Sequence, residues 1–246
     1  MSDTVLVETI GAVRILTLNR PDKLNAANLE MQQALLGELR KLGLHKDLRS
    51  LILTGAGRAF SAGGDHNILT EMAAGTLPAN THAQLGQVHI DTIHCMLSLD
   101  VPVIAAVPGC AVGYAAGLVA LCDQVVMGAS AFLSDPHVQY DIPATSAAQL
   151  IWPRQCSELL AREILMTGRK VMADEALRIG LCNRVCADGD ELKQALAMAE
   201  VFANLPPKGV AETKRAANGN RTGKKSLVRL GLAGIVQNPY GEEPLL

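Results

Sequence analysis

The sequence predicts one α/β domain, because short apolar runs rich in β-branched residues alternate along the chain with longer segments of helical periodicity. The clearest strand-to-helix unit is the apolar run Val101–Val107, followed by a glycine-punctuated turn and an alanine-rich segment at 114–122. A second unit runs from the helical pattern after Asn28 to the apolar run Leu51–Thr54. With 246 residues and 49% apolar side chains, the chain is long enough to bury the core of such a domain.

The N-terminal part of the chain predicts a β-hairpin followed by a helix. Two β-branched runs, at 5–10 and 13–18, flank Gly11, and residues 21–26 then form a loop. Asn28 is a suitable N-cap for the helix that follows. That helix has apolar residues at helical spacing and a closing glycine, namely Met31, Leu35, Leu39, Leu42 and Gly43.

Two glycine-rich turns each follow a predicted strand. The first, GAGRAFSAGGDHNIL, comes after Thr54, and the second contains Pro108, Gly109 and Gly113 and leads into a helix that begins at Tyr114. The start of a helix exposes unpaired N–H groups and the positive end of the helix dipole, which suits it to bind an anion. If the turns converge, each supplies an N–H group to one oxygen. Because turns use glycine widely, the glycines alone do not separate this function from ordinary turn chemistry.

The rest of the chain predicts further helices and short strands. Residues 66–84 begin as a helix and loosen around Gly75 and Pro78, which is typical either of a flap over a pocket or of a surface loop. The other expected elements are helices at 85–99, 156–167 (closed by Gly168), 173–179 and 191–205 (ended by Pro206 and Pro207), and strands at 124–127 and 131–133.

The composition excludes several classes of partner. A net charge of −2 and a pI near 6.3 indicate no basic surface for nucleic acid or an anionic membrane, and aromatic residues, at 3%, are too few for base stacking. The six cysteines are scattered among apolar residues, so we expect buried reduced thiols rather than disulfides or a zinc site. The start MSDTVLVETI has no basic region followed by a long apolar one, and no run is long enough to span a bilayer. We therefore expect a soluble, cytoplasmic protein.

Several ordered motifs resemble one known family. GRAFSAGGD followed by VPVIAAVPGCAVGYAAGLVALCD is similar to the paired motifs of the enoyl-CoA hydratase/isomerase (crotonase) superfamily. LNRPDKLNA, SDPHVQY and LLAREILMTGRKVMADEALRIGLCNRV continue the resemblance on both sides. The resemblance implies the ClpP/crotonase-like α/β fold of repeated ββα units, with residues 1–190 as the core and 191–246 as a helical C-terminal region. That region mediates trimers in the family, so we expect a homotrimer or a dimer of trimers; the tail QNPYGEEPLL replaces the usual final helix.

The resemblance also implies where an acyl-CoA thioester binds. Family members form an oxyanion hole from two backbone N–H groups, whose positions here are Gly64 and Tyr114. The family usually has glycine at the second position, so the Tyr114 phenol either fills pocket volume or places a hydroxyl beside the reacting carbon. Coenzyme A is expected as part of the substrate, with no separate cofactor and no metal. The residues that would receive it are Lys23, Leu24 and Ala26 on one side and Ala62, Gly63 and Asp65 on the other.

The acid/base groups of the family's hydratases are replaced in this chain. Two-carboxylate hydratases hold one glutamate in the central helix and another after a later strand, and those positions are Gly117 and His137 here. His137 can act as an acid or a base near neutral pH, and Asp135 and Asp141 flank it. A subgroup of carbon–carbon bond hydrolases pairs this histidine with an aspartate whose position is Ser146 here. The orienting carboxylate is therefore lost unless Asp141 or another acid replaces it.

Three functions stay open at this level. The first is an acyl-CoA enzyme that stabilises a thioester enolate, with His137 moving a proton as an isomerase, an atypical hydratase or a hydrolase. The second is a CoA-independent hydrolase that cleaves a β-diketone by retro-Claisen chemistry. The third is a non-catalytic acyl-CoA-binding paralogue. His66, directly after the first glycine-rich turn, is a second candidate acid/base, although a place on the helix surface is the plainer interpretation.

Overall fold

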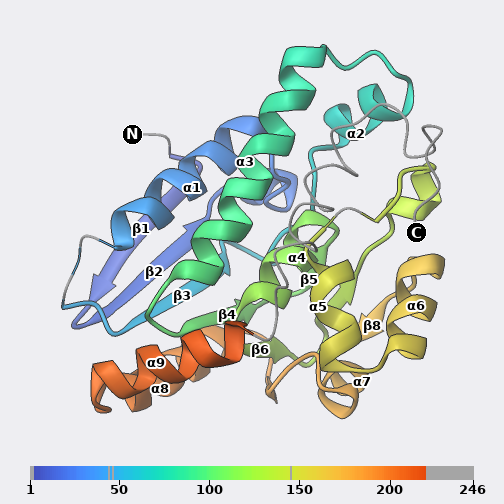
Figure 1. Cartoon of the computed structure of the whole chain (residues 1–246). Coiled ribbons are helices and arrows are strands. Elements are labelled where there is room, and N and C mark those ends of the chain that lie inside the picture. The colour runs from blue at the N-terminus through green and yellow to red at the C-terminus, as the bar shows by residue number, and fades with distance from the viewer. Residues whose placement is uncertain (1–2, 44, 46, 145, 220–246) are drawn as a thin grey trace.

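The larger of two sheets runs through the middle of the molecule (Figure 1). The computed structural model describes residues 3–43, 45, 47–144 and 146–219. The strands of this sheet, in spatial order, are β1 (Val5–Ile10), β2 (Val13–Leu18), β3 (Ser50–Gly55), β4 (Val103–Val107), β6 (Gln124–Gly128) and β9 (Arg184–Cys186). β1 and β2 form the predicted antiparallel hairpin, with Gly11 at φ 56° between them. The other neighbouring pairs are parallel.

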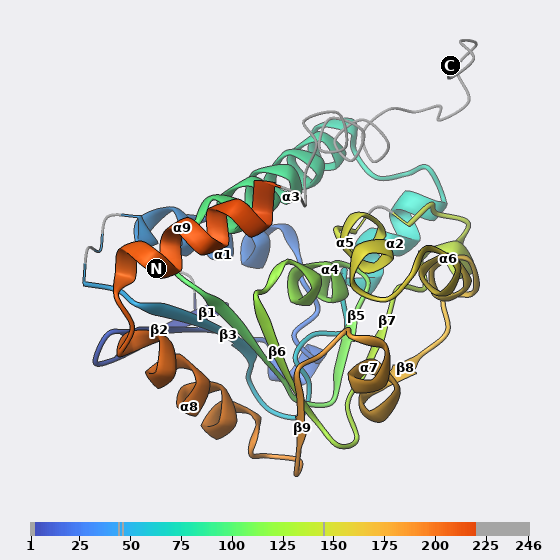
Figure 2. The same cartoon turned by 60° about the horizontal axis from the view of Figure 1, so that its bottom comes forward.

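Both faces of this sheet are buried. One face lies against α1 (Leu29–Leu42), α3 (Ala79–Ser98) and α4 (Tyr114–Leu121), and the other lies against α8 (Glu191–Ala203), as Figure 2 shows. Along β4 the side chains alternate: Val103, Ala105 and Val107 join the core on the first face, and Ile104 and Ala106 join the core against α8. A strand covered on both faces needs apolar residues at every position, which explains the continuous run VIAAV.

The smaller sheet contains β5 (Cys110–Val112), β7 (Phe132–Ser134) and β8 (Val171–Met172). β5 pairs in parallel with β7, and β7 pairs antiparallel with β8. The sequence analysis assigned residues 108–113 to a turn, and this was wrong for the three residues of β5. Such a short strand has no readable periodicity, and its pairing partner comes from a later part of the chain. β4–β5–α4, and β6–β7 followed by α5 (Ala148–Gln155), form the repeated ββα units that were expected.

Most helices begin and end where the local signals predict. The Asn28 side chain accepts a hydrogen bond from the Met31 N–H (3.0 Å) and caps α1, which ends before Gly43. α7 (Ala173–Ile179) has the predicted bounds, and α6 (Glu158–Thr167) ends at Gly168, whose φ is 64°. α8 ends at Ala203, slightly before the predicted position.

Three helical segments differ from the prediction. Residues 66–84, which were expected to loosen after a helical start, are mostly helical. α2 (His66–Ala73) is followed by a short connection that ends at Pro78, and α3 begins at Ala79. α5 was missed because it is short and contains Pro153. Pro207 begins a further helix, α9 (Pro207–Gly219), because proline is well suited to a first helical position, where its missing N–H is not needed. The tail QNPYGEEPLL lies outside the described residues.

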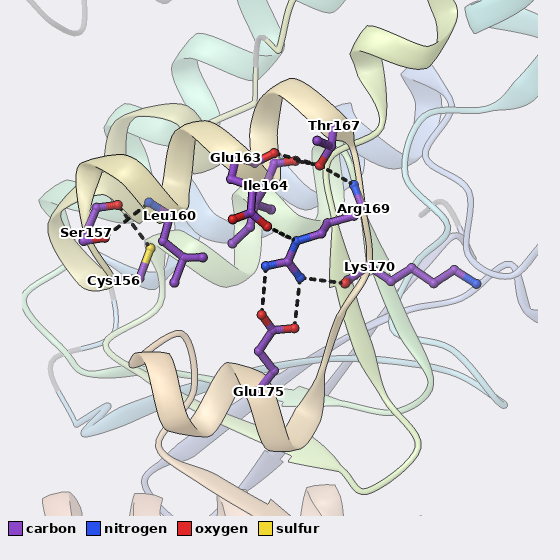
Figure 3. Close-up of polar contacts among 9 residues, drawn as sticks. All are labelled: Cys156, Ser157, Leu160, Glu163, Ile164, Thr167, Arg169, Lys170 and Glu175. Carbon is purple, nitrogen blue, oxygen red and sulfur yellow. Dashed lines mark hydrogen bonds and ion pairs between the residues drawn. The ribbon is translucent and has the colours of Figure 1, made fainter.

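Arg169 fastens the end of α6 to α7 (Figure 3). Its guanidinium donates to Glu163 in α6 (2.7 Å) and to both carboxylate oxygens of Glu175 in α7 (2.9 and 2.8 Å). The neighbouring Gly168 carbonyl accepts a hydrogen bond from the Ser134 hydroxyl (2.9 Å) at the end of β7. The α6–α7 corner therefore holds the end of β7 in place, directly before the segment that carries His137.

Within the described ranges, none of the helices combines the length and the apolar character needed to cross a membrane.

Candidate active site

The two glycine-rich turns lie side by side. The Ser61 N–H donates to the Cys110 carbonyl (2.9 Å), and the Val112 N–H donates to the Ser61 carbonyl (3.1 Å). Gly63, with φ 95°, passes so close to this neighbour that an added Cβ would lie 2.5 Å from the Val112 carbonyl oxygen. The two turns are therefore in direct backbone contact, and only glycine allows this approach at Gly63.

Each turn presents a backbone N–H group for which the described residues supply no acceptor. Gly113, at φ 51° and ψ −113°, starts α4, so the Tyr114 N–H is the first of the helix and has no intrahelical partner. Among the hydrogen bonds of the described residues, neither the Gly64 N–H nor the Tyr114 N–H has an acceptor. These are the donors that an oxyanion hole requires.

The loop that contains Lys23, Leu24 and Ala26 is attached to the first turn. The Ala62 N–H donates to the Leu24 carbonyl (2.8 Å), and the Ala27 N–H donates to the Gly63 carbonyl (2.7 Å). The Arg20 guanidinium then joins the Ala26 carbonyl (2.5 Å) to the Asp65 carboxylate (2.9 Å). The residues expected to receive coenzyme A are thus neighbours, and Lys23 is exposed at the end of the short 3-10 helix η1 (Pro21–Lys23).

His137 is held by a buried carboxylate. It begins the 3-10 helix η2 (His137–Tyr140), and its Nδ1 is hydrogen-bonded to Asp135 Oδ1. The second oxygen of Asp135 accepts a hydrogen bond from the Ser146 hydroxyl at 2.5 Å. Burial alone would raise the pKa of Asp135, but the hydrogen bond and charge of His137, with the hydrogen bond from Ser146, hold this pKa below its ordinary value. Asp135 therefore stays ionised in the core.

The imidazole of His137 lies against the start of α4. A Cβ added to Gly113 would be 3.2 Å from His137 Cε1 and 3.6 Å from its Nε2. Gly113 directly precedes Tyr114, so the imidazole and the Tyr114 N–H are at the same helix end. The geometry joins a candidate acid/base group to one candidate oxyanion donor.

The phenol of Tyr114 packs beneath α3. Its ring centroid lies 5.3 Å from that of His89, and its hydroxyl is buried without a hydrogen-bond partner in the described part of the chain. Burial raises the pKa of this phenol well above its ordinary value, and the neighbouring Thr92 hydroxyl opposes the shift only in part. The ring thus fills space between α3 and α4.

The remaining candidates have different positions. A Cβ at Gly117 would lie 2.9 Å from the Ala147 N and 3.1 Å from the Ser146 Cβ, so a larger side chain has no room. Asp141 and His66 are exposed, and neither has a side-chain hydrogen bond among the described residues. Thr145, beside Ser146, lies outside the described residues.

The sequence analysis noted Asp135 and Asp141 as the acids that flank His137. It left the orienting carboxylate to Asp141 or another acid, because the aspartate position of the similar hydrolases is Ser146 here. The structure instead places the carboxylate of Asp135 between His137 and Ser146. The motif DPH contained the signal, since Asp135 lies two residues before His137, but Asp141, four residues after it, was a second nearby acid in the sequence.

Comparison with known proteins agrees with this geometry. A sequence profile described as enoyl-CoA hydratase/isomerase matches residues 8–230. A putative enoyl-CoA hydratase of Thermus thermophilus is 35% identical over 204 residues, covering 83% of this chain and 79% of the relative. The crystal structure of an enoyl-CoA hydratase/isomerase from Mycobacterium paratuberculosis superposes with a TM-score of 0.87 at 35% identity, covering 96% of each chain. A monofunctional enoyl-CoA isomerase from M. smegmatis superposes with a TM-score of 0.75 at 28% identity, covering 93% of this chain and 99% of the other.

The profile match extends over most of the chain, and the structural match covers both sheets and the helices around them. The repeated ββα units therefore form a crotonase fold. The chain belongs to the enoyl-CoA hydratase/isomerase (crotonase) family of acyl-CoA enzymes.

Proposed function

We propose that this protein binds an acyl-CoA thioester with its carbonyl oxygen at the Gly64 and Tyr114 N–H groups, and that His137 moves a proton at the acyl carbons beside it. The observation that carries this proposal is the contact of the His137 imidazole with Gly113, the residue directly before the Tyr114 N–H. Each N–H donor would lower the barrier to enolate formation by about 2.7–4 kcal/mol.

Double-bond isomerisation is the reaction that one acid/base group performs most simply. Nε2 of His137 would take a proton from the α-carbon of a 3-enoyl thioester, and the electron pair would move into the carbonyl to give the dienolate. The imidazolium would then return the proton to the γ-carbon, yielding the 2-enoyl thioester. Of the two positions that carry glutamate in the two-carboxylate hydratases, one is Gly117 here, so concerted two-glutamate hydration is not available.

The test is proton exchange at the α-carbon. A saturated short-chain acyl-CoA incubated with the enzyme in D₂O should gain deuterium there, as measured by mass spectrometry, and a 3-enoyl-CoA should isomerise without gaining the mass of water. His137→Ala should slow exchange by about 10²- to 10⁴-fold while calorimetric binding of the thioester is retained. His66→Ala, at an exposed histidine, is the matched control and should exchange at the wild-type rate.

Two other outcomes would overturn the proposal. Thioester binding with no exchange in the wild-type protein would indicate a non-catalytic acyl-CoA-binding paralogue. No thioester binding, with cleavage of a cyclic β-diketone, would indicate the retro-Claisen hydrolase. One observation favours the retro-Claisen hydrolase as the second candidate function. A histidine that is hydrogen-bonded to a buried carboxylate is also suited to activate water.

A further inference from the structure

Only one nitrogen of the His137 ring is available for chemistry. Nδ1 is hydrogen-bonded to Asp135 Oδ1, and the Cε1 edge of the ring, which separates the two nitrogens, faces Gly113, with Nε2 at 3.6 Å from a Cβ built there. An ionised carboxylate accepts hydrogen bonds and cannot donate them, so Nδ1 must carry the proton in the neutral ring. The lone pair is then on Nε2, beside the start of α4.

The carboxylate itself is fixed at both oxygens. The side chain of Asp135 is 0% exposed, and its Oδ2 accepts from the Ser146 hydroxyl. The Ser146 oxygen in turn accepts from the Ala148 N–H (3.2 Å) in the first turn of α5. Because the Ala148 N–H donates to the serine oxygen, the serine hydroxyl donates its own proton to Asp135. The start of α5 thus holds Ser146, and Ser146 holds the Asp135 carboxylate.

We propose that Asp135 is a positioning residue that holds His137 in its Nδ1–H tautomer with Nε2 directed at the substrate, and that Ser146 locks Asp135 in that role. The effect on turnover rests on the proposed function of His137, whereas the tautomer does not. A buried carboxylate needs a hydrogen-bond donor even in a purely structural pairing, so the kinetic readout below separates a positioning role from a structural one.

Asp141 is the competing acid and provides a matched control. It lies four residues after His137 at the exposed end of η2, with φ 57°, and its side chain has no hydrogen bond to His137 in the described structure. If a negative charge near His137 were enough to set its tautomer and its turnover, Asp141→Asn and Asp135→Asn would change both to a similar extent.

The direct readout is nitrogen NMR of the histidine rings. The chain has six histidines, and the resonances that disappear in His137→Ala identify this one. At a pH where the ring is neutral, wild-type protein and Asp141→Asn should show the Nδ1–H tautomer. Asp135→Asn and Ser146→Ala should show an increased fraction of the Nε2–H tautomer, larger in the first. A wild-type ring with its proton on Nε2 overturns the inference, whether or not the variants fold.

Kinetics provide the second readout. Asp135→Asn should lower kcat for α-proton exchange by about 10²- to 10⁴-fold with KM changed less than about threefold, because binding contacts are kept and the reactive tautomer is lost. Ser146→Ala should lower kcat by about tenfold and Asp141→Asn by less than about twofold. Equal losses in Asp135→Asn and Asp141→Asn, or unchanged kcat in Asp135→Asn, overturn the positioning role. If NMR shows the expected tautomers but neither wild type nor any variant exchanges the α-proton, Asp135 positions the ring and the proposed function is overturned.

Discussion

At the scale of single residues, the missing side chains of Gly113 and Gly117 leave space beside the first turn of α4 for other residues. Gly113 adopts a backbone conformation with φ 51° that favours glycine, and its missing side chain leaves room for His137. Gly117 leaves room for the Ala147 N and the Ser146 Cβ, and the Ser146 hydroxyl donates a hydrogen bond to Asp135.

Gly117→Glu is expected to lower stability rather than create a hydratase. Its Cβ would lie 2.9 Å from the Ala147 N, and this overlap with backbone should cost about 1–3 kcal/mol in the free energy of unfolding and displace Ser146. Urea unfolding and α-proton exchange measure both effects. Gly37→Glu in α1 is the control, since a Cβ there meets nothing within 4 Å. A stable Gly117→Glu protein that adds water to a 2-enoyl-CoA would contradict this account.

Tyr114→Phe is expected to keep turnover and to raise stability by about 1 kcal/mol, because it removes a buried hydroxyl that has no hydrogen-bond partner among the described residues. The backbone N–H is unchanged, so oxyanion stabilisation should remain. Thermal unfolding and kcat are the measurements, and Tyr140→Phe, at a 47% exposed tyrosine, is the control. A drop in kcat with stability unchanged would show that the phenol touches the substrate instead.

At the scale of elements, the candidate site is assembled from loops and helix ends rather than from any one segment. The loop at 20–27 and the turn at 61–65 are joined through Arg20, and α5 and η2 are joined through Ser146 and Asp135. The Asp65 carboxylate has two roles, because it accepts from Arg20 and also caps α2 through the Asn67 N–H (3.2 Å). These hydrogen bonds between segments fix the positions of Asp65 and Asp135, which the local sequence does not determine.

Arg20→Met should weaken thioester binding several-fold and lower the free energy of unfolding by about 1 kcal/mol, because the joint between the loop and the turn loses both of its charge-assisted hydrogen bonds. Calorimetric affinity for an acyl-CoA and urea unfolding measure the two effects. Arg162→Met removes an arginine from an exposed ion pair in α6 and should change neither quantity. Unaltered affinity in Arg20→Met would rule out this coupling.

At the scale of the whole molecule, α9 lies near the end of the larger sheet at which β4 begins (Figure 1). Lys214, whose side chain is 6% exposed, donates to the Val101 carbonyl (2.7 Å) and forms an ion pair with Asp123 (2.7 Å). Asp123 also accepts from the Val103 N–H (2.8 Å), so a single buried network joins α9 to the start of β4.

Lys214→Met should cost about 1–3 kcal/mol in the free energy of unfolding, because the Val101 carbonyl and the Asp123 carboxylate lose their shared cation. The kcat of the folded variant should not change, since the residues that this network joins in the described structure, Val101, Val103, Asp123 and Lys214, are not candidate site residues. Lys208→Met, at an 86% exposed lysine of the same helix, is the matched control for urea unfolding. Equal stability of both variants would mean that the network contributes nothing.

The protein should also lose stability in acid through Asp135. The folded-state pKa of this group lies below its unfolded value of about 3.9, so its contribution is complete above that value and is lost as the pH falls through the folded pKa. Urea midpoints measured between about pH 5 and about pH 3 should fall less steeply for Asp135→Asn than for wild type. Asp141→Asn should follow the wild-type curve. Parallel curves for wild type and Asp135→Asn would contradict the assigned shift.

The sequence by itself determined the features whose physical cause is local. The hairpin around Gly11, the Asn28 cap of α1, the glycine end of α6 and the alternation of strands and helices follow from short-range preferences and apolar periodicity. The glycine-rich turns were recognised for the same reason, because a helix start exposes N–H groups wherever it occurs. The resemblance then placed Gly64, Tyr114 and His137 at one site.

Only the tertiary structure decided which groups meet. β5 exists because β7 supplies its hydrogen-bond partners, and α5 begins where Ser146 reaches both Ala148 and Asp135. Asp135 and Asp141 are equally plausible partners of His137 in the sequence, but burial and the direction of the chain at Pro136 place one carboxylate on Nδ1 and leave the other exposed. Contacts between segments far apart in the chain are set by packing, which no local pattern records.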